Sequence, residues 1–135
     1  MVRLLPSVTT VLLGILRPAL APIPVRSLMP DLGETVPVVM ARRAGGTALH
    51  PEFADTALVD VQCWHTTDAD AEALADACRA ALYRAWRTQQ VVPDAGSIAR
   101  WAEQSAPVLI PDDAAPKGVY RYQALYQLTI RPDRR

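Results

Sequence analysis

The sequence changes its hydrophobic period within residues 58–86, LVDVQCWHTTDADAEALADACRAALYRAW. Over residues 58–64 the side chains alternate in character, which is the pattern of a β-strand with one buried face. From about residue 67 apolar side chains recur every three or four positions, which is the pattern of a helix with one buried stripe. A strand that leads directly into a long amphipathic helix predicts a sheet covered by that helix.

The strand at residues 58–64 is expected to have two unlike faces. One face is wholly apolar and the other is mixed, as in a sheet that is covered on one side only. The apolar face comprises Ala57, Val59, Val61 and Cys63, and the mixed face comprises Leu58, Asp60, Gln62 and Trp64. Leu58 and Trp64 project from the less buried face, so we expect them to be candidates for contacts between subunits.

The helix is predicted over about residues 67–88, with Thr66 or Thr67 as its N-cap. Acidic side chains occupy its first turns and arginines its last turns, which is the order that the helix dipole favours. Its apolar stripe is rich in alanine and can lie close against a sheet: Ala71, Leu74, Cys78, Ala81, Leu82 and Ala85. The carboxylates of Asp68, Asp70 and Glu72 therefore indicate a solvated helix start rather than a metal site.

Residues 119–131 predict a long final strand, because their side chains alternate strictly. At roughly 3.3 Å per residue this strand would span about 40 Å, and we expect it near the centre of the sheet. One face carries Tyr120, Tyr122, Ala124, Tyr126, Leu128 and Ile130. Leu125 lies on the other face and is a further candidate for subunit contacts.

Residues 7–17 predict a short first helix, with Ser7 as its N-cap. Its apolar stripe, which includes Leu12 and Leu16, has to be buried by the sheet or by another copy of the protein. The segment resembles an export signal, but Arg17 and Pro22 flank the apparent cleavage site. It is also far shorter than the roughly 20 residues that span a bilayer. We therefore expect residues 1–20 to form a helical start to the domain, without export or membrane contact.

Proline and glycine interrupt the rest of the chain. The 12 prolines cluster at two places, residues 18–37 and 93–116, which predicts loops or sheet edges there. Between and beside them we expect strands at residues 25–29, 36–43 and 97–103.

The boundaries of these strands are set by the same residue types. Ala44-Gly45-Gly46 is expected to end the second strand. A helix is the alternative for residues 97–104, around Trp101. Residues 105–118 predict a loop within a proline-rich docking region at 88–118, and residues 132–135 predict a frayed tail.

Cys63, His65 and Cys78 are the first candidates for chemistry. A structural zinc site needs about four ligands in short paired spacings. Only His50 could complete such a set, and the spacing is absent. A Cys63–His65 nucleophile pair is equally unfavourable, because Cys63 lies on the apolar face, where a thiolate is costly. We therefore predict cysteines that pack as small hydrophobes, with no catalytic residue, metal or cofactor.

The charge balance excludes a general affinity for polyanions. The chain has 135 residues with 14 basic and 14 acidic side chains, which fits one domain with no net field to steer it to nucleic acid or a membrane. Its two cysteines are too few for a disulfide framework, which favours a reduced intracellular setting. Local basic clusters occur only at Arg42-Arg43 and Arg134-Arg135.

The order of elements is the most informative feature of the whole chain. An apolar first helix and a proline-rich connector precede a strand that ends in Arg42-Arg43-Ala44-Gly45-Gly46. The strand Asp60–Trp64, the acidic-start helix Asp68–Leu82 and the Tyr/Gln-rich strand Arg121–Thr129 follow. This order resembles the tail terminator (tail completion) proteins of bacteriophages with long non-contractile tails.

The resemblance implies an α/β (α+β) fold, with a mixed or mainly antiparallel sheet of about four to five strands and two helices on one face. It also implies a structural virion protein without catalytic residues. Copies would close into a homohexameric ring that caps the tail tube at the head–tail junction. The partners would be the tail tube protein and the head-completion proteins, with assembly in the host cytoplasm.

Within such a ring, Arg42 and Arg43 are candidates to face the lumen and meet passing DNA. The candidates for contacts between subunits are Leu12, Leu16, Leu58, Trp64, Trp101 and Leu125. Two alternatives stay open at this point. One is another head–tail connector, such as a head-closure protein, and the other is a small enzyme that uses Cys63 and His65.

Overall fold

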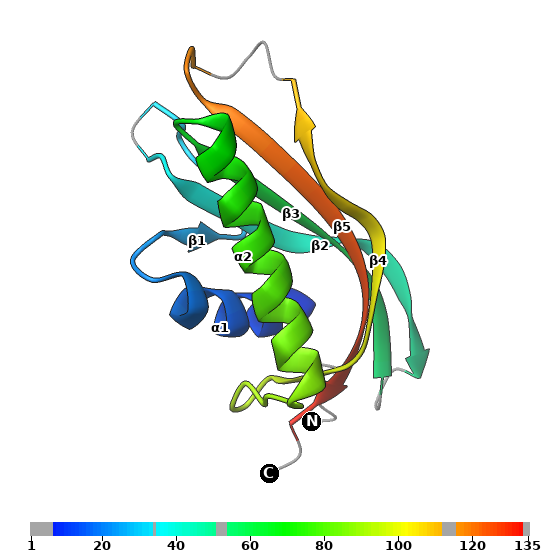
Figure 1. The fold of residues 1–135 in the computed structure, drawn as a ribbon. Coiled ribbons are helices and arrows are strands. Elements are labelled where there is room, and N and C mark those ends of the chain that lie inside the picture. Colours follow the sequence, from blue (N-terminus) through cyan, green and yellow to red (C-terminus); the bar gives the residue numbers. More distant parts are fainter. Residues whose placement is uncertain (1–6, 34, 51–53, 112–115, 134–135) are drawn as a thin grey trace.

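The structure is a computed structural model that describes residues 7–33, 35–50, 54–111 and 116–133, leaving out the side chains of residues 48–50. It contains two helices and five strands in these ranges (Figure 1). In chain order they are α1 (Val8–Leu20), β1 (Val25–Arg26), β2 (Val38–His50), β3 (Ala54–His65), α2 (Asp68–Arg87), β4 (Gly96–Ile110) and β5 (Tyr120–Pro132).

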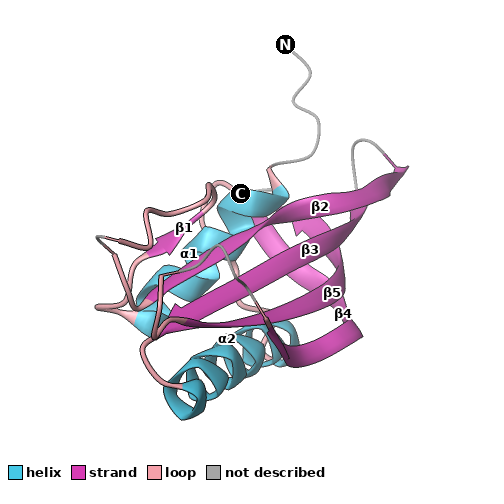
Figure 2. Ribbon diagram, turned by 90° about the horizontal axis from the view of Figure 1, so that it is seen from above, coloured by secondary structure: helices cyan, strands magenta, loops and turns pink. Residues whose placement is uncertain are grey.

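The five strands form one mixed sheet in the order β1-β2-β3-β5-β4. The short β1 is parallel to β2, and the other neighbours are antiparallel. Both helices lie on the concave side of the curved sheet (Figure 1). The expected α+β fold is therefore confirmed, with β1 and β4 as the two opposite edges (Figure 2).

The main core lies between the two helices and the central strands. On β3 the predicted apolar face is buried, and its register places Val59 beside Tyr126 and Cys63 beside Tyr122 of β5. Alternate residues of β5 from Tyr122 to Ile130 face the same core. The period-two patterns of both strands thus correctly predict which side chains meet the helices.

The helix α2 begins and ends almost where its sequence pattern indicates. Thr67 is the N-cap, and its hydroxyl oxygen accepts a hydrogen bond of 3.1 Å from the amide of Asp70. Three alanines, Ala71, Ala75 and Ala85, are buried against the sheet. Such small side chains allow the close helix–sheet contact that the alanine-rich stripe predicts.

The helix α1 is longer than predicted, because it continues to Leu20 with Pro18 inside its last turns. Its apolar stripe is buried in the core of the subunit, including Leu12 and Leu16. None of the described helices is long and apolar enough to cross a membrane.

The prediction that β2 ends at Arg43 is wrong. The strand continues to His50, and its register shifts between Arg43 and Gly45, as at a β-bulge. Gly46 has a φ of +101°, and a Cβ atom there would lie 2.2 Å from the carbonyl oxygen of Thr56. The glycines here mark a bend with a close backbone approach rather than the end of pairing.

The prediction of a loop at residues 105–118 is also wrong for residues 105–110. β4 extends through Pro107 to Ile110, with register shifts between Glu103 and Ser105 and between Ser105 and Val108. Proline is tolerated here because β4 is an edge strand, where an amide facing outward needs no ladder partner. The same strand excludes the helical alternative around Trp101.

The predicted frayed tail is ordered in its first part. Pro132 belongs to β5, and the amide of Asp133 donates a hydrogen bond of 3.1 Å to the carbonyl oxygen of Ala95. Residues 134–135, with the basic cluster expected there, lie outside the described residues.

Candidate interaction surfaces

The two cysteines lie together in the core. Their Sγ atoms are 3.6 Å apart, and both side chains are buried between β3 and α2. The hydrogen bond with Cys78 and burial raise the pKa of the Cys63 thiol well above its usual value. His65 is half-buried, and its Nδ1 accepts a hydrogen bond of 2.8 Å from the amide of Thr66. The thiol is thus a neutral core group, unlike the exposed thiolate that a nucleophile requires.

The acidic start of α2 has a structural role that the sequence did not reveal. The hydroxyl of Tyr122 donates to Asp68 Oδ1 at 2.6 Å and lies 3.1 Å from Glu72 Oε2. Both hydrogen bonds raise the pKa of Tyr122. The carboxylates therefore fasten the first turns of α2 to β5. In the ranges that the structure describes, no group of histidine, cysteine or carboxylate side chains could hold a metal ion, and the side chain of His50 lies outside them.

The opposite side of the sheet, which we call the helix-free face, carries a polar network. Asp60 is buried and accepts hydrogen bonds from the side-chain amides of Gln62 at 2.8 Å and Gln123 at 2.9 Å. Arg121 in turn donates to Gln62 Oε1 at 3.3 Å. The network supplies hydrogen-bond donors to the buried carboxylate of Asp60, and Arg121 is its outer member.

Arg42 and Arg43 lie in very different surroundings. The guanidinium of Arg43 makes a two-pronged ion pair with the buried carboxylate of Asp55, and its Nε donates to the carbonyl oxygen of Gly45 at 3.0 Å. Arg42 is exposed on the helix-free face, opposite Asp60 in the register. Of the two arginines predicted to meet DNA, Arg43 has a partner within its own subunit.

A cluster of aromatic rings lines the margin between α2 and β4. Tyr83 lies edge-on to Trp86 and Trp101, with ring centroids 5.6 and 5.4 Å away, and the two indoles are stacked at 6.3 Å. Tyr83 is 45 % exposed. Beside the rings, Arg79 donates to Glu103 at 2.7 Å. Sequence patterning had singled out only Trp101 of these residues.

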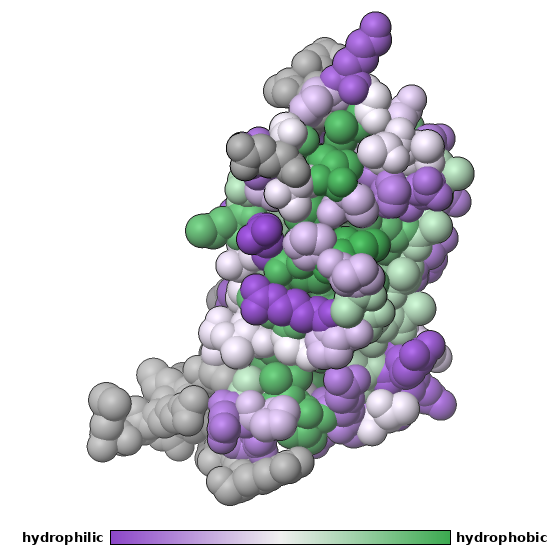
Figure 3. Space-filling model, turned by 90° about the vertical axis from the view of Figure 1, so that its left-hand side faces the viewer, coloured by the Kyte–Doolittle hydropathy of each residue, from purple (hydrophilic) through white to green (hydrophobic). Residues whose placement is uncertain are grey.

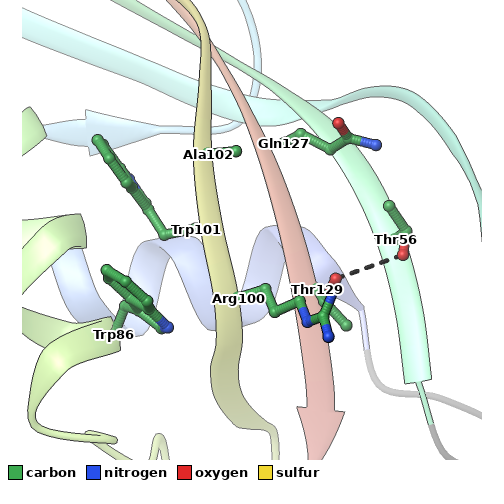
Figure 4. Close-up of a pocket in the computed structure, with 7 residues that line it drawn as sticks. All are labelled: Thr56, Trp86, Arg100, Trp101, Ala102, Gln127 and Thr129. Carbon is green, nitrogen blue, oxygen red and sulfur yellow. Dashed lines mark hydrogen bonds between the residues drawn. The ribbon is translucent and has the colours of Figure 1, made fainter.

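Two hollows open at this margin. The first, which we call the aromatic cleft, has a volume of about 490 Å³ and is lined by Asp76, Arg79, Ala80, Tyr83, Trp101 and Glu103. The second, of about 580 Å³, shares Trp101 and includes residues from both sides of β4, as Figure 4 shows: Thr56, Trp86, Arg100, Ala102, Gln127 and Thr129. The edge of β4 is therefore bordered by recessed surface that includes the rings of Tyr83, Trp86 and Trp101.

Exposed apolar side chains gather at two further places. Leu28 and Met29, between β1 and β2, are 74 % and 57 % exposed. Val108, Leu109 and Tyr120 are exposed where β4 ends and β5 begins. Figure 3 shows apolar surface reaching the solvent between polar residues on the helical side of the molecule. Clustered exposed apolar side chains of this kind are candidates for contact surfaces.

Comparison with known proteins identifies the family. A family model described as phage tail termination protein matches residues 4–135, nearly the whole chain. The chain belongs to this family. Phage tail termination proteins are structural components of the virion, not enzymes, which decides against the Cys63–His65 enzyme.

One solved structure supports the fold of this tail termination protein. It is a chain from the "Virion of native gene transfer agent (GTA) particle", with a TM-score of 0.57 and 11 % sequence identity. The match covers 93 % of this chain and 95 % of the other. At this identity the likeness shows the shared fold alone. No curated protein sequence matches the chain.

The predicted subunit-contact residues of this tail termination protein fall into four environments. Leu12 and Leu16 are fully buried by the sheet and α2, so the subunit itself covers the apolar side of α1. Trp64 is also fully buried, in a small second core on the helix-free face with Val38 and Met40, against which Leu32 and Val119 pack. These three residues offer no free surface to a neighbour, which corrects our reading of them as surplus apolar surface.

The remaining three predicted contact residues keep part of their surface. Leu58 and Leu125 are half-buried on the helix-free face, and Trp101 is half-buried at the aromatic cleft. Tyr83 and Trp86 were missed because they share the C-terminal turns of α2 with arginines, where a polar helix face was expected. Their spacing of three residues is the signal that could have revealed them, since such residues are neighbours on a helix surface.

Proposed function

We propose that this tail termination protein assembles into a ring, with six copies as the expected number, that caps the tail tube at the head–tail junction. The ring ends tube polymerisation and offers its other side to the head-completion proteins. The observation that carries this proposal is the family match over residues 4–135. The exposed apolar side chains and aromatic hollows support it, because they lie on the surface rather than around a reactive group.

The open sheet favours a ring over a two-fold dimer as the mode of assembly. Its two edges differ, since β1 has two residues and a proline-rich flank, whereas β4 has 15 residues and an aromatic border. Unlike edges suit head-to-tail contacts, which close into rings when the rotation per subunit permits.

The end of the β4–β5 hairpin is the part that we assign to docking on another virion protein. Val108, Leu109 and Tyr120 are exposed there, far along the strands from the aromatic hollows. We assign the docking role to these three side chains instead of to the longer region predicted at residues 88–118. The tail tube protein and a head-completion protein are the two candidate partners for this end, encountered in the host cytoplasm during assembly.

A weak contact with DNA is the role that we propose for Arg42. It is exposed on the helix-free face, where Arg100 is also exposed, and a carboxylate nearby, Asp60, is held by two glutamine amides. Arginines presented this way attract phosphate without reading sequence. Arg43 is less suited, because Asp55 already pairs with its guanidinium.

The proposal is tested by electron microscopy of phage particles made without the protein. The expected result is tails of uncontrolled length, or heads and tails that remain separate. Normal tails joined to heads would contradict the proposal. Adding the wild-type protein back during assembly is the control, and it should restore joined particles with tails of uniform length.

A further inference from the structure

We propose that the apolar knob formed by Leu28 and Met29 of one copy inserts into the aromatic cleft between α2 and β4 of the next copy. This inference rests on the proposed ring, because it names the two surfaces through which neighbouring copies would hold each other. The structure offers both halves of the contact on every subunit.

The knob is held in shape by buried residues on both sides. Val25 of β1 and Pro30 are buried, whereas Leu28 and Met29, which lie between them and form the knob, are exposed. The loop then turns at Asp31, whose Oδ1 accepts a hydrogen bond of 2.9 Å from the amide of Gly33. Leu32 packs on the small core around Trp64. A pre-shaped apolar projection loses little conformational freedom when it binds, which favours a docking role.

The aromatic cleft provides a receptor of matching chemistry. Its volume of about 490 Å³ is of the size that small apolar groups fill. Tyr83 and Trp101 form aromatic walls, and the indole Nε1 of Trp101 is buried without a hydrogen-bond partner among the described residues.

The positions of knob and cleft require a second copy. The knob follows β1 at one edge of the sheet and the cleft borders β4 at the other edge, with three strands between them (Figure 2). A subunit therefore cannot fill its own cleft. Each copy can give its knob to one neighbour and receive a knob from the other, which is the head-to-tail arrangement of a closed ring.

The charges beside the two surfaces are complementary. Arg26 is exposed next to the knob, and Asp76 is exposed at the border of the cleft. An ion pair across the contact would determine how the two copies align more than it would add to their affinity. The complementarity supplies a second, independent test, because exchanging the two charges preserves the pair.

Cysteine crosslinking in assembled particles tests the contact directly. We expect the double variant Met29→Cys with Ala80→Cys to form a ladder of disulfide-linked subunits on non-reducing gels. Each single variant should give no ladder, because the contact joins unlike surfaces. The native cysteines are buried and serve as an internal background. Val108→Cys combined with Ala80→Cys is the matched control, and it should not crosslink.

Assembly of surface variants gives the second readout. Leu28→Asp and Tyr83→Asp should each lower the yield of assembled rings about tenfold or more, since a carboxylate would be buried against aromatic rings. Both positions are exposed, so folding is expected to persist and circular dichroism checks it. Arg26→Asp alone should weaken assembly, and adding Asp76→Arg should restore it.

The outcomes separate this inference from the proposed function. Two results would overturn the knob-and-cleft contact while leaving the proposed ring in place. One is that rings form but the Met29→Cys and Ala80→Cys double variant does not crosslink. The other is that Leu28→Asp does not lower the yield of rings. A wild-type protein that makes no ring in joined particles would contradict both.

Discussion

The two sides of α2 differ in how much of their apolar surface the subunit itself covers. Its side toward β3 is closed: alanines, Leu82 and Cys78 are buried there against the sheet. Its C-terminal side toward β4 is open, with Tyr83 exposed and a cleft beside Trp101. The closed side supplies folding free energy through burial, whereas the open margin keeps apolar surface available for another molecule. Stability and assembly should therefore respond to different substitutions.

The largest expected difference is between two adjacent residues of α2. Leu82→Ala should lower the free energy of unfolding by about 2–5 kcal/mol, because it leaves a cavity in the core. Tyr83→Ala should cost only about 1 kcal/mol, since the ring is partly exposed and loses one set of aromatic contacts. Urea unfolding at equal subunit concentration measures both values. Equal losses would contradict the distinction between a closed and an open side.

A second test concerns the thiol pair on the closed side. Cys63→Ala and Cys78→Ala should each lower the free energy of unfolding by about 1–2 kcal/mol, through lost packing. The double variant should lose less than the sum, because the two sulfur atoms contact each other. Joining of heads to tails should persist wherever the fold persists. Loss of joining with an unchanged melting temperature would argue for a chemical role of the thiol.

A third test measures how much the N-cap of α2 contributes to the stability of the fold. Thr67→Ala should cost about 1 kcal/mol, because the amide of Asp70 loses its acceptor. Thr66→Ala is the matched control, with an expected loss below about 0.5 kcal/mol for an exposed residue outside the cap. Thermal unfolding of the two variants makes the comparison, and the reverse order would assign the cap to Thr66.

The smallest effect is a pH dependence where α2 meets β5. Hydrogen bonds to Asp68 and Glu72 raise the pKa of Tyr122, and burial raises the pKa of Tyr126. Unfolded tyrosines lose their protons near pH 10, while these two keep theirs in the folded protein. Stability should thus be complete below about pH 10 and fall as the pH rises further.

Replacing Tyr122 with Phe separates the two tyrosines. The variant should be less stable at neutral pH and should show a shallower loss of stability above about pH 10. Denaturant midpoints measured from pH 8 to about pH 11 give the two slopes. Parallel curves for wild type and variant would show that Tyr122 does not contribute to the pH dependence.

The closed side could be predicted from the sequence because its signal is periodic. β3, α2 and β5 each repeat a short pattern, and the order of these elements resembled the tail terminators. β2 and β4 extended further than predicted, since a glycine bulge and Pro107 look like strand ends when the partner strand is unknown. A local sequence pattern predicts the ends of a strand correctly only where pairing with a neighbouring strand does not extend it past a glycine or proline.

Side-chain surroundings that depend on contacts between distant segments could not be predicted, either at the open margin or elsewhere on the sheet. Trp64 looked exposed by alternation, but Leu32 and Val119 cover it from other parts of the chain. Arg43 looked free, but its guanidinium pairs with Asp55 of the neighbouring strand β3. Trp86 and Trp101 meet only because the β4–β5 register places Trp101 opposite Leu128 on the helix side of the sheet.

A cryo-electron microscopy reconstruction of the head–tail junction in intact particles tests the central claim most directly. The claim is that the protein acts through contacts among identical copies at its open margins. The expected density is a closed ring at the end of the tail tube, with the α2–β4 margin of each copy against its neighbour. A single copy at the junction, or copies that do not touch one another, would contradict it.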